Sequence, residues 1–210
     1  MTVTGWLTIF GFAVILTALA LPLGRYMAAV YTGGRTFLDP VMRRPERLMY
    51  RALRVDPGRG QDWKSYARSV IAFSLAGWLL LYLILRSQGL WNFTGLNPMH
   101  YASPPWNVTF NTASSFLTNT NWQYYGGETT LSYFSQMAGL TVQNFASAAV
   151  GIVVAVALIR GIAKRVADRD AADADSIGNF WHDLVRTLLY LLLPLSLIVA
   201  VILISQGVIQ

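Results

Sequence analysis

The sequence predicts an all-α polytopic membrane protein, and three observations carry that prediction. Of its 210 residues, 54% are hydrophobic and only 12% are charged, whereas soluble domains carry about 25% charged residues. Four predominantly apolar runs reach the roughly 17–25 residues that cross a bilayer. They cover residues 3–23, 69–85, 138–159 and 184–204. The third observation is that part of the chain repeats itself.

The first apolar run, residues 3–23, differs from a secretory signal peptide in two ways. No basic segment precedes it, and it exceeds the ~7–15 apolar residues of a signal-peptide core. We therefore expect a leading transmembrane span over residues 1–30. An Arg-rich segment follows at 31–68, and we expect it to be a cytoplasmic loop.

The positions of the basic residues predict the orientation in the membrane. Ten Lys and Arg residues lie from Arg25 to Arg68 and five more from Arg160 to Arg186, whereas residues 87–159 contain none. Because basic loops stay in the cytoplasm, we expect the N-terminus and the 87–137 segment to lie outside. The net charge of +6 then requires no nucleic acid, and the Arg-rich loop is expected to meet lipid head groups or a partner subunit.

A repeat at an offset of 118 residues defines the organisation of the chain. Seven positions are identical, pairing Trp63, Arg68, Ile84, Leu85, Ser87, Gln88 and Gly89 with Trp181, Arg186, Ile202, Leu203, Ser205, Gln206 and Gly207. The pattern predicts a parallel repeat with a first span–loop–span unit over 69–160 and a cytoplasmic link at 161–183. Residues 184–210 would be the first span of a second, truncated unit, which Pro194 is expected to kink. We therefore expect the chain to be a fragment.

The outer segment of the first unit has the plan of a pore loop at about residues 109–123. "TFNTASSFL" predicts a short half-helix, with Thr109 or Asn111 as its N-cap. "TNTNWQ" then returns the chain outward. Irregular backbone at membrane depth is tolerated only where it is buried in protein or lines a water-filled cavity. The segment is therefore either a loop that lines a path or an ordinary exposed turn.

The oxygen atoms of Thr118, Asn119, Thr120 and Asn121 favour a path for an alkali cation. Such an ion loses its hydration shell only where oxygens replace the waters, as backbone carbonyls do in potassium filters. Carbonyls that point the same way need alternating backbone conformations. Gly permits these most readily and Asn is the next most tolerant residue. One loop cannot encircle an ion, so repeats or oligomers are required.

Other polar residues near this stretch allow two interpretations each. Glu128 either attracts cations at the mouth or is simply solvated. Gln143 and Asn144 lie inside the third span, where they either line the path or tie helices together. Ser147 and Gly151 are expected to pack against a neighbouring helix as a pair of small residues.

The sequence predicts no catalytic site of its own. It has no Cys and only two His, which excludes thiolate chemistry and His-rich metal or haem sites. It also has no phosphate-binding loop, no aspartyl-phosphorylation motif and no nucleophile–base pair. We expect no covalent cofactor.

The motifs "SFLTNTNWQ" and "YFSQMAGLTVQNF", within Phe110 to Gly161, closely resemble the potassium-binding A subunit of the bacterial Kdp potassium-transporting ATPase. That family belongs to the potassium-transporter superfamily, built of span–pore loop–span repeats. The resemblance covers the whole chain and implies its N-terminal portion: a leading span, one full repeat and the start of a second. It also implies a bacterial inner membrane and complex partners, namely a P-type subunit that hydrolyses ATP and small accessory membrane subunits.

The resemblance implies a potassium filter strand at Thr118, Asn119, Thr120 and Asn121, with Gln123 adjacent to it. Ser115, Glu128 and Asn144 are further candidates to contact potassium. The expected function is a channel-like subunit that binds and translocates potassium in an ATP-driven, high-affinity uptake complex, with ATP bound by the partner. The alternatives are an ion-gradient-driven potassium transporter of the same superfamily and a membrane scaffold that transports nothing.

Overall fold

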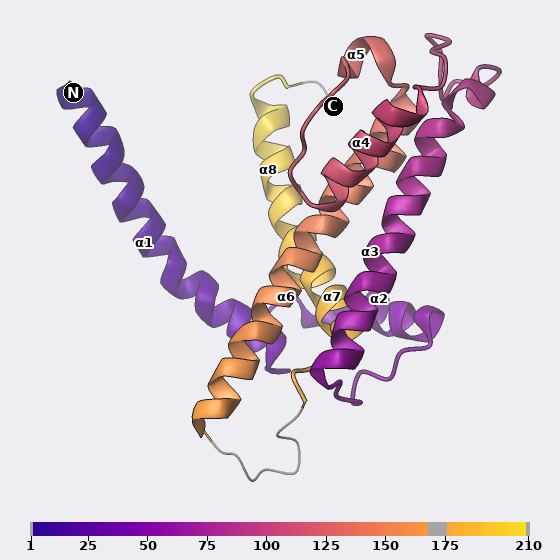
Figure 1. Ribbon diagram of the computed structural model, residues 1–210. Helices are drawn as coiled ribbons and strands as arrows, with labels where there is room; N and C mark the ends of the chain where they lie inside the picture. The colour runs from indigo at the N-terminus through magenta and orange to yellow at the C-terminus, as the bar shows by residue number, and fades with distance from the viewer. Residues whose placement is uncertain (1, 168–175, 209–210) are drawn as a thin grey trace. The chain divides into compact units, whose positions relative to one another are not determined.

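The computed structural model describes residues 2–167 and 176–208, and within them every named element is helical (Figure 1). Two compact units are present: Met1–Leu53 with Leu189–Gln210, and Arg54–Leu188. Four helices are long and apolar enough to cross a membrane: Val3–Tyr31, Trp63–Arg86, Ser135–Ala163 and Phe180–Ser205. The four predicted spans are therefore confirmed as long apolar helices.

Each of these helices extends beyond its apolar run. The helix α3 (Trp63–Arg86) begins inside the expected cytoplasmic loop, because Asp62 caps it by accepting a hydrogen bond from the Ser65 N–H at 3.0 Å. The same hydrogen bonding to Ser65 lowers the pKa of the Asp62 carboxyl. Helix α2 (Asp39–Leu53) lies within the Arg-rich segment that we expect to be a cytoplasmic loop, so part of that segment is an amphipathic helix. Part of the expected 161–183 link lies outside the described residues.

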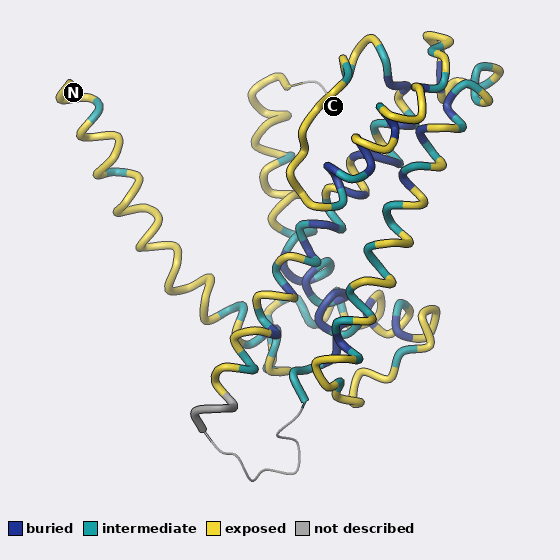
Figure 2. The backbone as a smooth tube through the Cα atoms, in the orientation of Figure 1, coloured by how far each residue is buried: buried dark blue, intermediate teal, exposed yellow. Residues whose placement is uncertain are grey.

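The first unit contains α1 (Val3–Tyr31), α2 and α8 (Leu193–Ser205). Most of α1 is exposed, as Figure 2 shows, which suits a helix whose apolar side chains meet lipid. The buried Glu46 carboxylate of α2 accepts hydrogen bonds from the hydroxyls of Tyr50 at 2.9 Å and Tyr190 at 2.8 Å. A buried charge needs such partners because desolvation disfavours it.

In the fourth span, which Pro194 is expected to kink, a π-helix, η3 (Thr187–Leu192), lies directly before α8. Proline has no N–H for the carbonyl four residues earlier. That carbonyl belongs to Tyr190, and it accepts the Tyr26 hydroxyl at 2.6 Å. The Tyr26 hydroxyl therefore donates to the Tyr190 carbonyl in place of the N–H that Pro194 lacks.

The second unit places a short helix between two spans. It contains α3, η1 (Gln88–Trp91), α4 (Trp106–Leu117), α5 (Gly127–Thr130), the π-helix η2 (Ser135–Thr141), α6 (Val142–Ala167) and α7 (Phe180–Arg186). Helix α4 packs against both α3 and α6 (Figure 1). The apolar core around this helix, within the second unit, consists of Leu81, Leu85, Ala113, Phe116, Leu131 and Leu140.

Small residues let α3 approach the third span closely. A Cβ built at Gly139 would lie 3.0 Å from Leu81 Cδ1, and one built at Gly77 would lie 2.7 Å from Gln143 Oε1. Gln143 is buried at this contact. Of its two interpretations, the structure therefore supports the one in which it ties helices together.

Candidate functional site: the hairpin after helix α4

Helix α4 begins three residues before the predicted N-cap at Thr109, and five before Asn111, so both cap predictions are wrong. Pro105 holds the N-cap position with φ −60° and ψ 157°. Its fixed φ suits a helix start. The Thr109 hydroxyl donates to the carbonyl of Pro105 at 3.1 Å inside the first turn, so it serves the helix interior. At 12 residues, α4 is about 18 Å long, too short to cross the ~30 Å hydrocarbon core.

The backbone after α4 alternates in handedness. Thr118 has φ −82°, Asn119 has φ +55°, and Asn121 has φ +56°, while Thr120 between them is not in the positive-φ region. Residues with a Cβ seldom adopt positive φ, and Asn is among the few that do so readily. The alternation that carbonyls on one side require is therefore present in this segment.

All four N–H groups of this segment point back to the last carbonyls of α4. The N–H groups of Thr120 and Asn121 converge on the Ser115 carbonyl at 3.0 and 3.3 Å. Those of Thr118 and Asn119 donate to Ser114 at 3.1 Å and to Phe116 at 3.4 Å. Successive N–H groups that face one acceptor are typical of alternating backbone. The carbonyls of residues 118–121 accept no hydrogen bond from any described residue, and all four residues are exposed.

Most side chains of the segment are already engaged. The Thr118 hydroxyl lies 3.1 Å from the carbonyls of Ser114 and Ser115, and 2.8 Å from the Thr120 hydroxyl. The Asn119 side-chain oxygen accepts a hydrogen bond from Ser147, and the Asn121 side-chain amide donates to Asn144. The backbone carbonyls and the Asn121 side-chain oxygen are therefore the oxygens of the segment that have no hydrogen bond to a described residue and are free to meet a ligand.

The other predicted site residues fall at different depths. Ser115 is buried, and its hydroxyl oxygen has no hydrogen-bond partner among the described residues. Gln123 is exposed, beyond the alternating segment. The Asn144 side chain is exposed on α6 and contacts Asn121. The hairpin therefore brings Ser115, residues 118–121 and Asn144 together, with Gln123 at its outer end.

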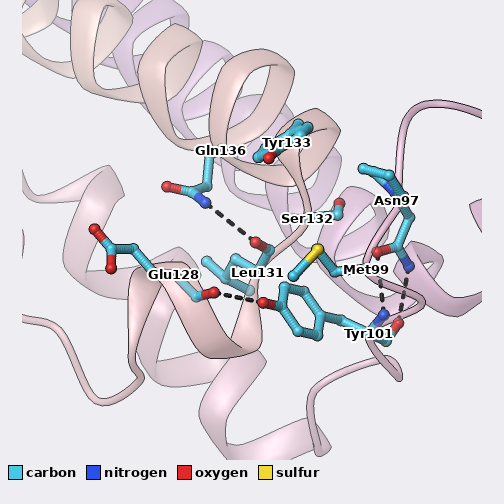
Figure 3. A pocket seen from close by; sticks show the side chains of 9 residues that line it. Asn97, Met99, Tyr101, Glu128, Leu131, Ser132, Tyr133 and Gln136 are labelled. Carbon is cyan, nitrogen blue, oxygen red and sulfur yellow. Dashed lines mark hydrogen bonds between the residues drawn. The ribbon is translucent and has the colours of Figure 1, made fainter. Parts of the chain in front are cut away.

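Glu128 lies apart from the alternating segment, exposed in the first turn of α5. It borders a cavity of about 160 Å³, shown in Figure 3, where the Tyr101 hydroxyl donates to the backbone carbonyl of Glu128. Nearby, burial raises the pKa of the Tyr125 hydroxyl, so this group stays neutral at physiological pH. The Glu128 carboxylate forms no ion pair with a described residue, as expected for a solvated side chain.

Gln88 anchors the outer segment, residues 87–137, which the charge pattern predicts to be external. Its side chain is fully buried, and its amide donates to the carbonyls of Ala102 at 2.9 Å and Thr130 at 2.8 Å. Its side-chain oxygen accepts from the Ser132 N–H and the Ser135 hydroxyl, both at 2.8 Å. The end of α3 is thereby joined to the loop before α4 and to the start of the third span. The sequence pattern marked Gln88 only as a repeated residue.

Ser147 is the residue whose contact the sequence interpretation missed. We expect it to pack against a helix as a partner of Gly151, but its hydroxyl reaches Asn119, and a Cβ built at Gly151 has no described atom within 4 Å beyond its chain neighbours and the adjacent helix backbone. A signal for this role exists in the sequence. Ser147 follows Asn144 by three residues, so both polar side chains share one face of a helix.

The repeat recurs in local geometry. The Ser87 hydroxyl donates to the Ile84 carbonyl at 3.0 Å, and the Ser205 hydroxyl donates to the Ile202 carbonyl at 2.7 Å. These are the same positions at the offset of 118. The two spans therefore end with the same side-chain cap.

Four span-length helices, with a short helix and an alternating segment between two of them, define a polytopic membrane protein with a half-helix hairpin. The chain belongs to the potassium-transporting ATPase A subunit family, whose sequence profile matches residues 10–210.

Relatives from several bacteria agree with that family. A potassium-transporting ATPase potassium-binding subunit of Sorangium cellulosum is 53% identical over 210 residues, which are 100% of this chain and 34% of the relative. Subunits of the same name from Methylorubrum extorquens and Pseudomonas syringae pv. tomato are 49% and 50% identical, over 100% and 98% of this chain and 35% of each relative. The chain thus spans about a third of the length of these relatives.

Proposed function

We propose that this chain is the N-terminal portion of a channel-like subunit that binds and translocates potassium in an ATP-driven uptake complex. The carbonyls of Thr118, Asn119, Thr120 and Asn121 form one strand of its filter. One observation carries this assignment: the alternating φ angles turn every N–H of the segment toward α4, and no described residue donates to the carbonyls of these four exposed residues.

Carbonyl oxygens suit potassium because they replace the waters of its hydration shell. In this assignment the hydroxyl and amide groups hold the segment in place, and the carbonyls contact the ion. A single strand covers only one side of an ion, so equivalent strands from further repeats would complete the ring. The internal repeat at an offset of 118 residues supports such an arrangement.

ATP binding and hydrolysis belong, in this proposal, to a P-type partner subunit, with small accessory membrane subunits completing the complex. The names of the relatives, which describe a transporting ATPase, favour ATP over an ion gradient as the energy source. The charge distribution supports a site in the inner membrane with the N-terminus outside. The filter strand then opens toward the outside, where potassium is captured.

The test is potassium uptake at limiting external concentration by the full-length chain in its assembled complex. Asn119→Pro cannot keep φ at +55°, because proline holds φ near −65°, so apparent affinity and potassium-over-sodium preference should both fall. Gln123→Arg places a positive charge near the ion. At about 6 Å and an effective dielectric of about 20, the repulsion is roughly 3 kcal/mol, or around a hundredfold in affinity before solvent screening.

Thr120→Val serves as the comparison, because it keeps the volume and removes only a hydroxyl that contacts Thr118. It should change affinity less than either of the other substitutions. If both Asn119→Pro and Gln123→Arg leave the affinity and the ion preference unchanged, the filter assignment is wrong and the segment is an ordinary polar turn.

A further inference from the structure

Two side chains of α6 contact the two left-handed asparagines of the segment. Resting on the filter assignment above, we propose that Asn144 and Ser147 are positioning residues that hold Asn119 and Asn121 at positive φ and so set the ion preference of the strand. Neither side chain needs to touch the ion in this role.

The contacts are specific in order and direction. Asn121 Nδ2 donates to Asn144 Oδ1 at 3.0 Å, and the Ser147 hydroxyl lies 3.3 Å from Asn119 Oδ1. Asn144 and Ser147 are three residues apart and lie on one face of α6. Asn121, the later residue of the strand, contacts Asn144, the earlier residue of the helix, and Asn119 contacts Ser147. The strand and the helix therefore run in opposite directions.

The two contacts differ in burial. Ser147 is buried, and its single hydroxyl hydrogen is shared with the carbonyl of Asn144 at 3.2 Å, whereas Asn144 is exposed. The Ser147 hydroxyl therefore keeps an acceptor in its own helix, and its contact with Asn119 lies at the buried, inner end of the strand. The Asn144 contact fixes its outer end.

The need for such contacts follows from the backbone. Positive φ is unfavourable for any residue with a Cβ, and this strand uses Asn at both positive-φ positions where Gly would carry no such penalty. The Cβ makes Asn less tolerant of positive φ than Gly, but the side-chain amide that it carries can hydrogen-bond to α6. The strand therefore depends on α6 for the backbone conformation that aligns its carbonyls.

The substitutions to test are Asn144→Ala and Ser147→Ala in the full-length chain within its assembled complex. Loss of one hydrogen bond corresponds to roughly a 2- to 10-fold change in an equilibrium constant. We expect the apparent KM for potassium to rise by that factor and the preference for potassium over sodium to fall, with the maximal rate per assembled complex retained. A purely structural defect would instead lower the amount of complex and leave the ion preference unchanged.

Two comparison variants separate this role from general packing. Ser147→Thr keeps the hydroxyl and should stay closer to the wild type than Ser147→Ala. Ser196→Ala makes the same chemical change at a span serine whose hydroxyl donates to the carbonyl of Leu193 in its own helix. It should leave the ion preference unchanged.

A second set of variants at the exposed Asn121 keeps the proposal falsifiable even if Ser147→Ala fails to assemble. Asn121→Gly and Asn121→Ala both lose the contact with Asn144, but only Gly adopts positive φ without strain. In an Asn144→Ala background, Asn121→Gly should therefore restore part of the ion preference that Asn121→Ala does not.

The outcomes also distinguish this inference from the filter assignment. If Asn119→Pro changes the ion preference while Asn144→Ala and Ser147→Ala do not, the filter stands and the positioning role is overturned. Strictly additive effects of Asn121→Ala and Asn144→Ala would overturn it as well, because residues that act through one hydrogen bond are non-additive. If Asn119→Pro and Gln123→Arg also leave affinity and preference unchanged, both proposals fail.

Discussion

Asn119 and Asn121 show how one residue type can meet two requirements of the segment. The backbone needs positive φ at alternating positions, and asparagine tolerates that region better than other residues with a Cβ. The same side chains hydrogen-bond to α6, which glycine could not do. The pair therefore combines conformational tolerance with an anchor to the neighbouring span.

Gln88 provides a prediction at the residue scale that is independent of potassium. Gln88→Leu would remove the partners of two donors, the Ser132 N–H and the Ser135 hydroxyl, and of two carbonyls. Each unpaired buried group costs about 1–3 kcal/mol, so we expect a destabilisation of roughly 3 kcal/mol or more. Thermal unfolding of the purified complex, with limited proteolysis of the outer segment, measures this loss.

Gln88→Met is the matched variant, because it keeps the length of the side chain and, like Gln88→Leu, loses all four hydrogen bonds. Its melting temperature should fall as that of Gln88→Leu does, which separates the lost hydrogen bonds from the change in side-chain shape. A Gln88→Leu complex as stable as the wild type would show that Gln88 does not anchor the outer segment.

At the scale of elements, the hairpin depends on the close approach of α3 and η2. Gly139→Ala would place a Cβ 3.0 Å from Leu81 Cδ1 and 3.4 Å from Ile84 Cγ2. Overpacking typically costs about 1–3 kcal/mol, against a helix-propensity gain of about 1 kcal/mol for replacing Gly. We therefore expect net destabilisation of up to about 2 kcal/mol, read as a lower melting temperature of the complex.

Gly151→Ala is the control on the same span, since its built Cβ has no described atom within 4 Å beyond its chain neighbours and the adjacent helix backbone. The same helix-propensity gain applies there without the overpacking. A Gly139→Ala complex as stable as the Gly151→Ala complex would mean that η2 can shift away from α3 at little cost.

At the scale of the whole molecule, the basic residues predict that the 31–68 segment is cytoplasmic and the 87–137 segment external. These 210 residues contain no cysteine, so they add no thiol of their own to the labelling of a single introduced cysteine. Arg59 and Met99 are both exposed. We expect an impermeant thiol reagent applied to intact cells to label Met99→Cys and not Arg59→Cys. Permeabilised cells, in which both sites should react, provide the control, and the reverse pattern in intact cells would invert the topology.

The sequence by itself determined the four spans, the repeat and the oxygen-rich stretch. Transmembrane spans can be recognised because a helix that crosses a bilayer needs a long apolar run and pairs its own backbone groups. Both requirements concern one continuous stretch of sequence. The stretch from Thr118 to Asn121 could be recognised because an alternating backbone needs residues that tolerate positive φ. That tolerance depends on residue type, so the sequence shows it directly. The start of α4 was missed because Pro105 begins a helix without a side-chain cap.

Only the tertiary structure decided which groups meet across the chain. Gln88 is fully buried, and its four hydrogen-bond partners lie between 14 and 47 residues away along the chain. Ser147 contacts Asn119, 28 residues earlier, because α4 and α6 pack side by side. Such partners depend on how helices dock. Docking is set by the packing of small residues and buried side chains over the whole unit, so no local pattern encodes it.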